Sequence, residues 1–110
     1  MFKKKHSFSD RLAESNHIRQ KYPDRVPIIL EPDSRISLSK KKYLVSWDLT
    51  MGQFIYIIRN RVKLASHQSL LFLTQQTVPS TSELIKSLYE RYKDRDGFLY
   101  MNCCVENVFG

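Results

Sequence analysis

The chain has 110 residues and a formal net charge of +7, and 42% of its side chains are apolar. This length predicts a single domain with one hydrophobic core. Only three Gly and four Pro are present, which excludes collagen-like and low-complexity chains. Cys103 and Cys104 are adjacent, so we expect no disulfide. His6, His17 and His67 lack the spacing of metal ligands, so we expect no metal and no cofactor.

Membrane spans and secretion signals are not expected. The amino-terminal segment is charged and has no apolar core of the kind that signal peptides carry. The apolar runs at 54–58 and 70–73 are far shorter than the roughly 20 residues that cross a bilayer, so we expect a cytoplasmic protein. Positive charge is concentrated in residues 1–25, which favours an anionic partner such as nucleic acid, anionic lipid or acidic peptide.

The pattern of apolar and turn-forming residues predicts a helical leader followed by alternating strands and helices. One or two short helices are expected within residues 7–22, and further helices at 51–62 and 84–92. The expected strands are 26–30, 43–47, 70–74 and 98–105. We find no internal repeat and no long linker in this order. It predicts an α+β domain in which helices pack on one face of a mixed sheet.

Capping patterns mark the start of the later helices. Thr50 and Gln53 have capping-box spacing, and Ser80 with Glu83 repeats it before the last helix. The stripe expected to face the core is Met51, Ile55, Ile58 and Val62. A second row, expected to be exposed, is Phe54, Ile57 and Arg61.

Enzymatic chemistry is not expected. A nucleophile with its base, a metal cluster and a phosphate-binding glycine loop are all missing at recognisable spacing. The sequence therefore favours a protein that other proteins bind or modify.

Two segments resemble the signature segments of the autophagy ubiquitin-like modifiers, the family that includes the GABA receptor-associated protein. They are Lys21-Tyr-Pro-Asp-Arg-Val-Pro-Ile-Ile-Leu-Glu31 and Lys40-Lys-Lys-Tyr-Leu-Val-Ser-Trp-Asp-Leu-Thr-Met-Gly-Gln-Phe54. Shorter matches are Ile58-Arg-Asn-Arg61, Phe98-Leu-Tyr100 and Phe109-Gly110. The resemblance implies a ubiquitin-like β-grasp with an amino-terminal helical extension. Residues 1–24 would form the helical subdomain and residues 25–110 the ubiquitin-like domain.

The same resemblance implies conjugation through the last residue. The carboxylate of Gly110 would be activated, carried by activating and conjugating enzymes, and joined to phosphatidylethanolamine on autophagosomal membranes. A deconjugating cysteine protease would act at the same end. Glycine suits this position because a residue without Cβ passes through narrow clefts.

The resemblance also implies peptide binding by strand addition at residues 43–47, with cargo receptors supplying aromatic-x-x-aliphatic motifs. The aromatic pocket would be lined by Glu14, Ile18, Pro27, Ile29, Lys42, Leu44 and Phe98. The aliphatic pocket would be formed by Tyr43, Val45, Leu49, Phe54, Ile57 and Arg61. Arg25, with Lys42 and Arg61, would favour acidic residues beside the motif.

This sequence departs from the family pattern at the rim of the aliphatic pocket, where Ser46 and Trp47 replace a proline and a small residue. Gly97 also replaces an aromatic residue. Two alternative functions stay open. One is an unconjugated peptide-binding or cytoskeletal adaptor that uses the same groove. The other is a basic nucleic-acid-binding module, but RNA-binding aromatic motifs are missing, so nucleic acid is not the expected partner.

Overall fold

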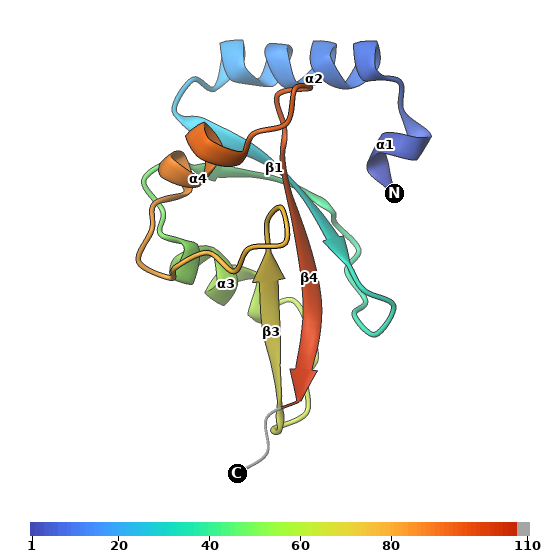
Figure 1. The fold of residues 1–110 in the computed structure, drawn as a ribbon, viewed down its shortest axis with the longest axis vertical. Helices are drawn as coiled ribbons and strands as arrows, with labels where there is room; N and C mark the ends of the chain where they lie inside the picture. The colour runs from blue at the N-terminus through green and yellow to red at the C-terminus, as the bar shows by residue number, and fades with distance from the viewer. Residues whose placement is uncertain (108–110) are drawn as a thin grey trace.

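A computed structural model describes residues 1–107 of the chain (Figure 1). Its elements in chain order are α1 (Phe2–Lys5), α2 (Phe8–Lys21), β1 (Arg25–Pro32), β2 (Lys42–Ser46), α3 (Met51–Arg59), β3 (Gln68–Leu73), α4 (Ile85–Tyr92) and β4 (Leu99–Asn107). The expected order of a helical leader, two strands, and alternating helices and strands is confirmed. The short helix α1 gives the amino-terminal extension a second helix, and it lies before residue 7, outside the segment where the leader was predicted to be helical.

The four strands form one mixed sheet in the order β2-β1-β4-β3. β1 pairs antiparallel with β2 and parallel with β4, and β4 pairs antiparallel with β3. The first and last strands thus lie side by side in the centre, while β2 and β3 form the edges. This arrangement confirms the ubiquitin-like fold with amino-terminal helices.

Helices lie on both faces of the sheet, and the expectation of a single covered face was wrong. Val26, Ile28 and Leu30 of β1 belong to the core cluster that includes residues of α3 and α4. Pro27 and Ile29 alternate with them, so they point to the opposite face, where α1 and α2 lie. Because both sets of side chains are buried, β1 needs a cover on each side.

Phe54 lies at the centre of the core, and the expectation that it is exposed was wrong. Its ring packs edge-to-face against Tyr43 and Phe72, with ring centres 5.9 and 6.1 Å apart. With Met51 and Ile58 it forms a fully buried stripe at spacings of three and four residues. Two members of the expected stripe, Ile55 and Val62, pack at the margin of this core and are only partly buried. The helix is therefore rotated by part of a turn from the predicted orientation.

The predicted capping box of α3 is confirmed. The main-chain N–H of Gln53 donates to Thr50 Oγ1 at 3.1 Å, and the N–H of Thr50 donates to Gln53 Oε1 at 2.9 Å. α3 ends at Arg59, three residues before the predicted end. The capping box therefore fixes the start of this helix more sharply than its end.

The capping pattern at Ser80 does not start a helix, because α4 begins at Ile85. Main-chain carbonyls of the residues before α4 instead accept hydrogen bonds from the start of α3. The N–H groups of Met51 and Gly52 donate to the carbonyls of Glu83 and Thr81 at 2.8 and 2.9 Å. Residues 81–83 form a turn, in which the Glu83 N–H donates to the Ser80 carbonyl at 3.2 Å, and the helix begins after it.

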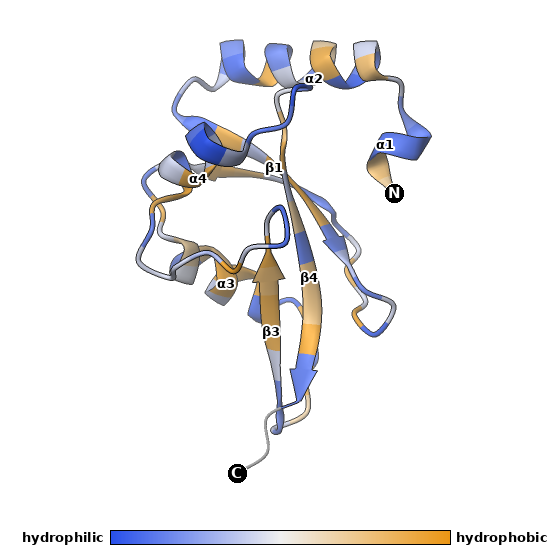
Figure 2. Cartoon of the chain, in the orientation of Figure 1, coloured by the Kyte–Doolittle hydropathy of each residue, from blue (hydrophilic) through white to orange (hydrophobic). Residues whose placement is uncertain are grey.

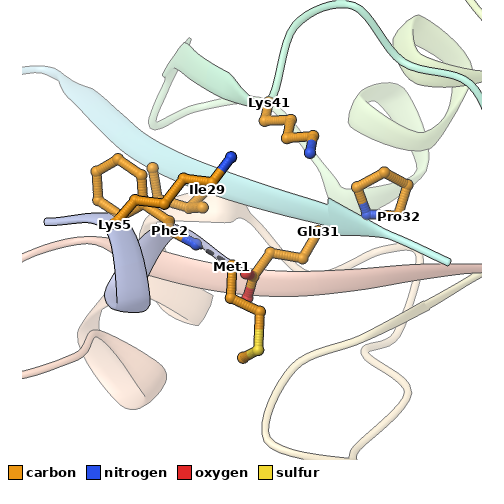
Figure 3. A pocket seen from close by; sticks show the side chains of 7 residues that line it. All are labelled: Met1, Phe2, Lys5, Ile29, Glu31, Pro32 and Lys41. Carbon is orange, nitrogen blue, oxygen red and sulfur yellow. Dashed lines mark hydrogen bonds between the residues drawn. The ribbon is translucent and has the colours of Figure 1, made fainter.

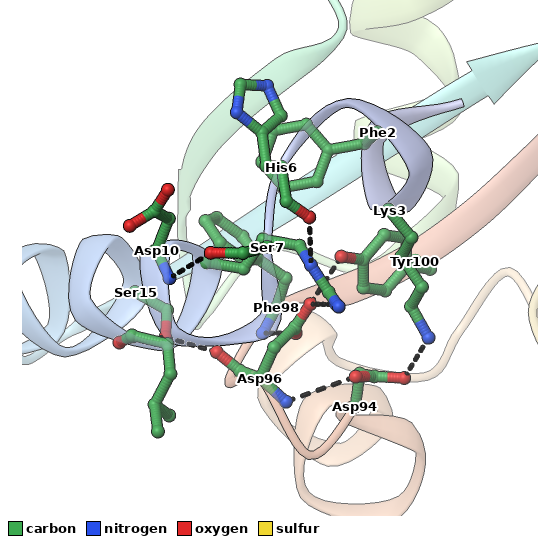
Figure 4. A network of polar contacts seen from close by, with 12 residues as sticks. Phe2, Lys3, His6, Ser7, Asp10, Ser15, Asp94, Asp96, Phe98 and Tyr100 are labelled. Atoms are coloured by element: carbon green, nitrogen blue, oxygen red, sulfur yellow. Dashed lines mark hydrogen bonds and ion pairs between the residues drawn. The ribbon is translucent and has the colours of Figure 1, made fainter.

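A polar network centred on Asp96 attaches α2 to the rest of the molecule (Figure 4). Arg11 Nη1 lies 2.6 Å from Asp96 Oδ2, and the Tyr100 hydroxyl donates to the same oxygen at 2.5 Å. Ser15 Oγ donates to the main-chain carbonyl of Asp96. At Gly97, where φ is +90°, a Cβ would lie 2.3 Å from Ser15 Oγ, so only glycine fits this close approach.

Candidate peptide-binding site

The edge strand β2 presents main-chain groups that the sheet leaves unpaired. Leu30 N–H donates to the Lys41 carbonyl at 2.8 Å, and Trp47 N–H donates to the Asp24 carbonyl at 3.1 Å. Bonded and non-bonded pairs alternate along an antiparallel ladder. The main-chain groups of Lys42, Leu44 and Ser46 therefore point away from β1, toward the open edge.

Pro27 lies in the β1–β2 ladder without the loss of a hydrogen bond between these two strands. It lies opposite Leu44, at a non-bonded position of the β1–β2 pair. Its missing N–H therefore breaks no bond between the strands. The pairing of β1 with β4 begins at Ile28, one residue later, so the proline lies outside that ladder as well and is compatible with a central strand.

A pocket of about 230 Å³ lies between α2 and β2. Its lining residues are Ile18, Pro27, Ile28, Lys40, Lys42, Tyr43, Leu44 and Phe98. Five of the seven residues expected around an aromatic side chain are among them. Another expected residue, Glu14, lies at the rim, where its carboxylate accepts a hydrogen bond from Lys42 Nζ at 2.8 Å.

Ile29, the seventh residue, lines a neighbouring cavity of about 280 Å³ together with Phe2 and Glu31 (Figure 3). The Phe2 ring centre is 5.4 Å from that of Phe98 and 5.1 Å from Lys42 Nζ. Phe2 N–H donates to the Glu31 carboxylate at 3.3 Å. Phe2 thus contacts two residues that line the aromatic pocket, Phe98 and Lys42. Sequence reasoning missed it because one aromatic residue in a charged leader produces no periodic signal.

The expected aliphatic set lies on the α3 side of β2, the opposite face of the edge. Tyr43 and Phe54 form its buried floor, and the Arg61 guanidinium carbon lies 5.9 Å from the Tyr43 ring centre. Val45 and Leu49 pack against the same core and are partly buried. Ile57 is also partly buried. Burial raises the pKa of Tyr43, and the nearby positive charge of Arg61 opposes this, so the phenol is neutral at physiological pH.

Trp47 borders this aliphatic set. Its side chain packs against the core and is partly buried, and Lys86 Nζ lies 4.7 Å from its ring centre. Lys86 N–H also donates to the Trp47 carbonyl at 3.0 Å, which fixes the main chain here. The indole is thus held at the end of β2, beside the expected aliphatic set.

Positive charge surrounds this edge. Arg25 is exposed beside the end of β2, and its guanidinium carbon lies 5.4 Å from the Tyr22 ring centre. Lys42 lines the pocket on the α2 side, and Arg61 lies beside the expected aliphatic set. The edge therefore offers main-chain hydrogen bonds, two apolar surfaces and an attraction for acidic side chains.

Residues 1–107 hold neither a metal site nor a membrane-spanning helix. No group of three or more His, Cys, Asp or Glu side chains in this range is arranged to hold a metal ion. No helix in it is long and apolar enough to cross a bilayer. Gly110, the expected conjugation residue, lies outside the described residues.

Comparison with known proteins places the chain in a family. The family model described as "Autophagy protein Atg8 ubiquitin like" matches residues 10–110. Autophagy-related protein 8 of Mycosarcoma maydis is 49% identical over 112 residues, covering 99% of this chain and 95% of that relative. The same protein of Aspergillus niger is 46% identical with the same coverage.

Solved structures agree with this assignment. The crystal structure of Trypanosoma brucei ATG8 is similar with a TM-score of 0.88 and 40% identity, covering 99% of this chain and 97% of that one. Plasmodium falciparum Atg8, solved in complex with a Plasmodium falciparum Atg3 peptide, has a TM-score of 0.84 and 35% identity, with 94% of each chain covered.

Proposed function

Because the chain belongs to the Atg8 family of ubiquitin-like autophagy proteins, we propose that it is a modifier conjugated through Gly110 to phosphatidylethanolamine. It is cytoplasmic before conjugation and lies on autophagosomal membranes afterwards. There it recruits cargo receptors and autophagy machinery that carry aromatic-x-x-aliphatic motifs. The chain acts as a substrate and a binding module, not as an enzyme.

The observation that carries the binding function is the placement of two apolar surfaces on opposite faces of one open edge. Leu44 belongs to the pocket on the α2 side, whereas Tyr43 and Val45 face α3. In an added strand, residues three positions apart also point to opposite faces. The spacing of an aromatic-x-x-aliphatic motif therefore matches the two surfaces. Main-chain groups of Lys42, Leu44 and Ser46 would bond the ligand.

The partners in conjugation follow from the family. Activating and conjugating enzymes carry the Gly110 carboxylate as a thioester, and a deconjugating cysteine protease reverses the attachment. The complex of Plasmodium falciparum Atg8 with an Atg3 peptide supports a peptide-binding surface in proteins of this fold. Neither a metal nor a cofactor in the chain is needed for these steps, and nucleic acid is not a partner.

Deletion of Gly110 tests the conjugation. We expect the truncated chain to fold and to bind a motif peptide as the full chain does, but to form no lipid adduct. The measurement is intact-mass spectrometry after incubation with the conjugation enzymes, ATP and vesicles that contain phosphatidylethanolamine. The full chain is the matched control. An adduct on the truncated chain would refute the site.

Substitution Leu44→Asp tests the groove. A carboxylate in the apolar pocket must be desolvated beside an aromatic ligand, so affinity for an aromatic-x-x-aliphatic peptide should fall about tenfold or more. Calorimetric titration measures the change. Val78→Asp is the control, because Val78 is 58% exposed and outside the pocket lining. Equal affinity of Leu44→Asp and the unmodified chain would contradict the groove and leave the conjugation untouched.

A further inference from the structure

A second cleft, of about 490 Å³, lies between α2 and the loop that joins α4 to β4. Arg19 lines it from α2, while Lys93 and Arg95 line it from the loop. The Tyr89 ring lies between them, with the Arg19 guanidinium carbon 4.8 Å and Lys93 Nζ 5.5 Å from its centre. The Tyr89 hydroxyl donates to the Gly97 carbonyl at 2.7 Å, which fixes the ring in this position.

The cleft carries an excess of positive charge. Among the described residues that line it, Asp94 is the single carboxylate. That carboxylate is already bound by Lys3, with Nζ 2.5 Å from Oδ1. Arg19 donates to the main-chain carbonyl of Arg25 at 3.0 Å, a bond that leaves its charge uncompensated. Two cations therefore lie against the Tyr89 ring, and a third, Arg95, lines the same cleft, without a free acidic neighbour in the lining.

We propose that this cleft is a second interaction site, distinct from the β2 edge, that binds an acidic segment of a partner protein. Carboxylates of the segment pair with Arg19, Lys93 and Arg95. Leu12, which is partly exposed, provides an apolar contact for an aliphatic side chain between the carboxylates. Complementary charge of this kind sets orientation and association rate.

The position of the cleft favours a protein over a membrane. α2 and the end of β4 lie at opposite ends of the molecule, whose longest dimension is 46 Å (Figure 1). Three residues beyond Asn107 span at most about 10 Å. If Gly110 is conjugated, a step that rests on the proposed function, the cleft faces away from the lipid surface that holds the chain.

Neutralising the exposed side of the cleft tests the proposal in solution, without any conjugation. The variant is Lys93→Gln with Arg95→Gln, and the matched control is Arg59→Gln with Lys63→Gln, which removes the same two residue types from exposed positions elsewhere. The probe is a synthetic peptide of glutamates around one leucine, without aromatic residues. Binding is followed by amide chemical shifts of the isotope-labelled full chain at low salt.

We expect peptide-induced shifts at Arg19, Tyr89 and residues 93–97, with affinity reduced about fivefold in the cleft variant and unchanged in the control. Shifts confined to β2, or equal weakening in both variants, would overturn the site. A cleft variant that loses affinity for phosphatidylserine vesicles but not for the peptide would overturn the protein partner. Loss of lipidation after deletion of Gly110 is a separate readout, so the two proposals fail independently.

Discussion

The two faces of the sheet are covered by different kinds of contact. On one face, α3 and α4 contribute to a cluster of sixteen buried residues that is almost entirely apolar. On the other face, α2 buries only Arg11 and Ser15, and α1 has no buried residue. Figure 2 shows the corresponding mixture of hydrophilic and hydrophobic residues along α2. Tight packing thus builds the fold, and directional polar bonds position the helices that border the clefts.

The largest expected effects on the free energy of unfolding come from substitutions at the centre of the contacts on each face of the sheet. Phe54→Ala removes a buried ring from the apolar core and should lower the free energy of unfolding by about 3–5 kcal/mol. Asp96→Ala leaves the buried Arg11 guanidinium without its partner, a loss of about 3 kcal/mol. Urea unfolding measures both changes.

Hydrogen exchange shows which helices and strands each substitution destabilises. In Asp96→Ala, amides of α2 should exchange much faster while those of β1 stay protected, because the polar network holds only the helix. In Phe54→Ala, protection should fall throughout the sheet. Asp48→Ala, at an exposed aspartate, is the control. Equal acceleration of α2 and β1 in Asp96→Ala would show that the two faces unfold together.

A smaller effect concerns the ion pair between Lys3 and Asp94, which attaches α1 to the loop before β4. Burial acts to raise the pKa of Asp94, but hydrogen bonds from Lys3 and the Asp96 N–H, with the charges of Lys3 and Arg11, outweigh it and lower the pKa. A lowered pKa means that the carboxylate stabilises the folded state at neutral pH, and that this contribution disappears as the pH falls through the lowered value. We expect α1 to loosen in acid, below about pH 4.

Lys3→Met tests this link between α1 and the loop before β4. The variant should show loosened α1 amides already at pH 7 and little further change in acid. The partly exposed pair should contribute about 0.5 kcal/mol. Lys4→Met, one residue on at another exposed position, is the control. Amide exchange measured between pH 7 and pH 3 makes the comparison, and an acid transition of the same size in both variants would contradict the role of Lys3.

Features that depend on neighbouring residues could be predicted from the sequence, whereas features that depend on distant contacts could not. Strand positions and the Thr50 capping box depend on residues close together in the chain, and the structure confirms them. The orientation of Phe54 was wrong because two apolar rows run along α3, and only the position of the sheet decides which row is buried. The last helix begins within one residue of its predicted start, but Ser80 does not cap it, because the carbonyls of Thr81 and Glu83 bind α3, a demand that the local pattern does not contain.

The residues of the candidate site could be predicted where they lie in a family motif. Contacts between positions far apart in the sequence could not be predicted. Five residues of the aromatic pocket lie together as the resemblance implied. The Arg11–Asp96 pair joins positions 85 residues apart, and no spacing rule connects them. The contact of Phe2 with Phe98 is similarly remote. Contacts of this kind arise from the topology that brings β4 beside β1, with the leader helices above both.

The subtlest test uses two adjacent cysteines of β4 that point to opposite faces. Cys103 belongs to the apolar core and is fully buried, and burial raises the pKa of its thiol to about 12, with smaller contributions from Cys104 and Asp33. Because the thiolate is the reactive form, Cys103 should resist alkylation in the native protein at pH 8. Cys104 is partly exposed and lines a cavity with Met1.

We therefore expect iodoacetamide to modify Cys104 first, as measured by mass in the single variants Cys103→Ser and Cys104→Ser. Lys3→Met should speed the reaction of Cys104, since release of α1 uncovers that side of β4, and should leave Cys103 unreactive. Phe54→Ala should act on Cys103 instead, because it loosens the core around that thiol. If either substitution changed both thiols alike, the two faces of the sheet would not be independent layers.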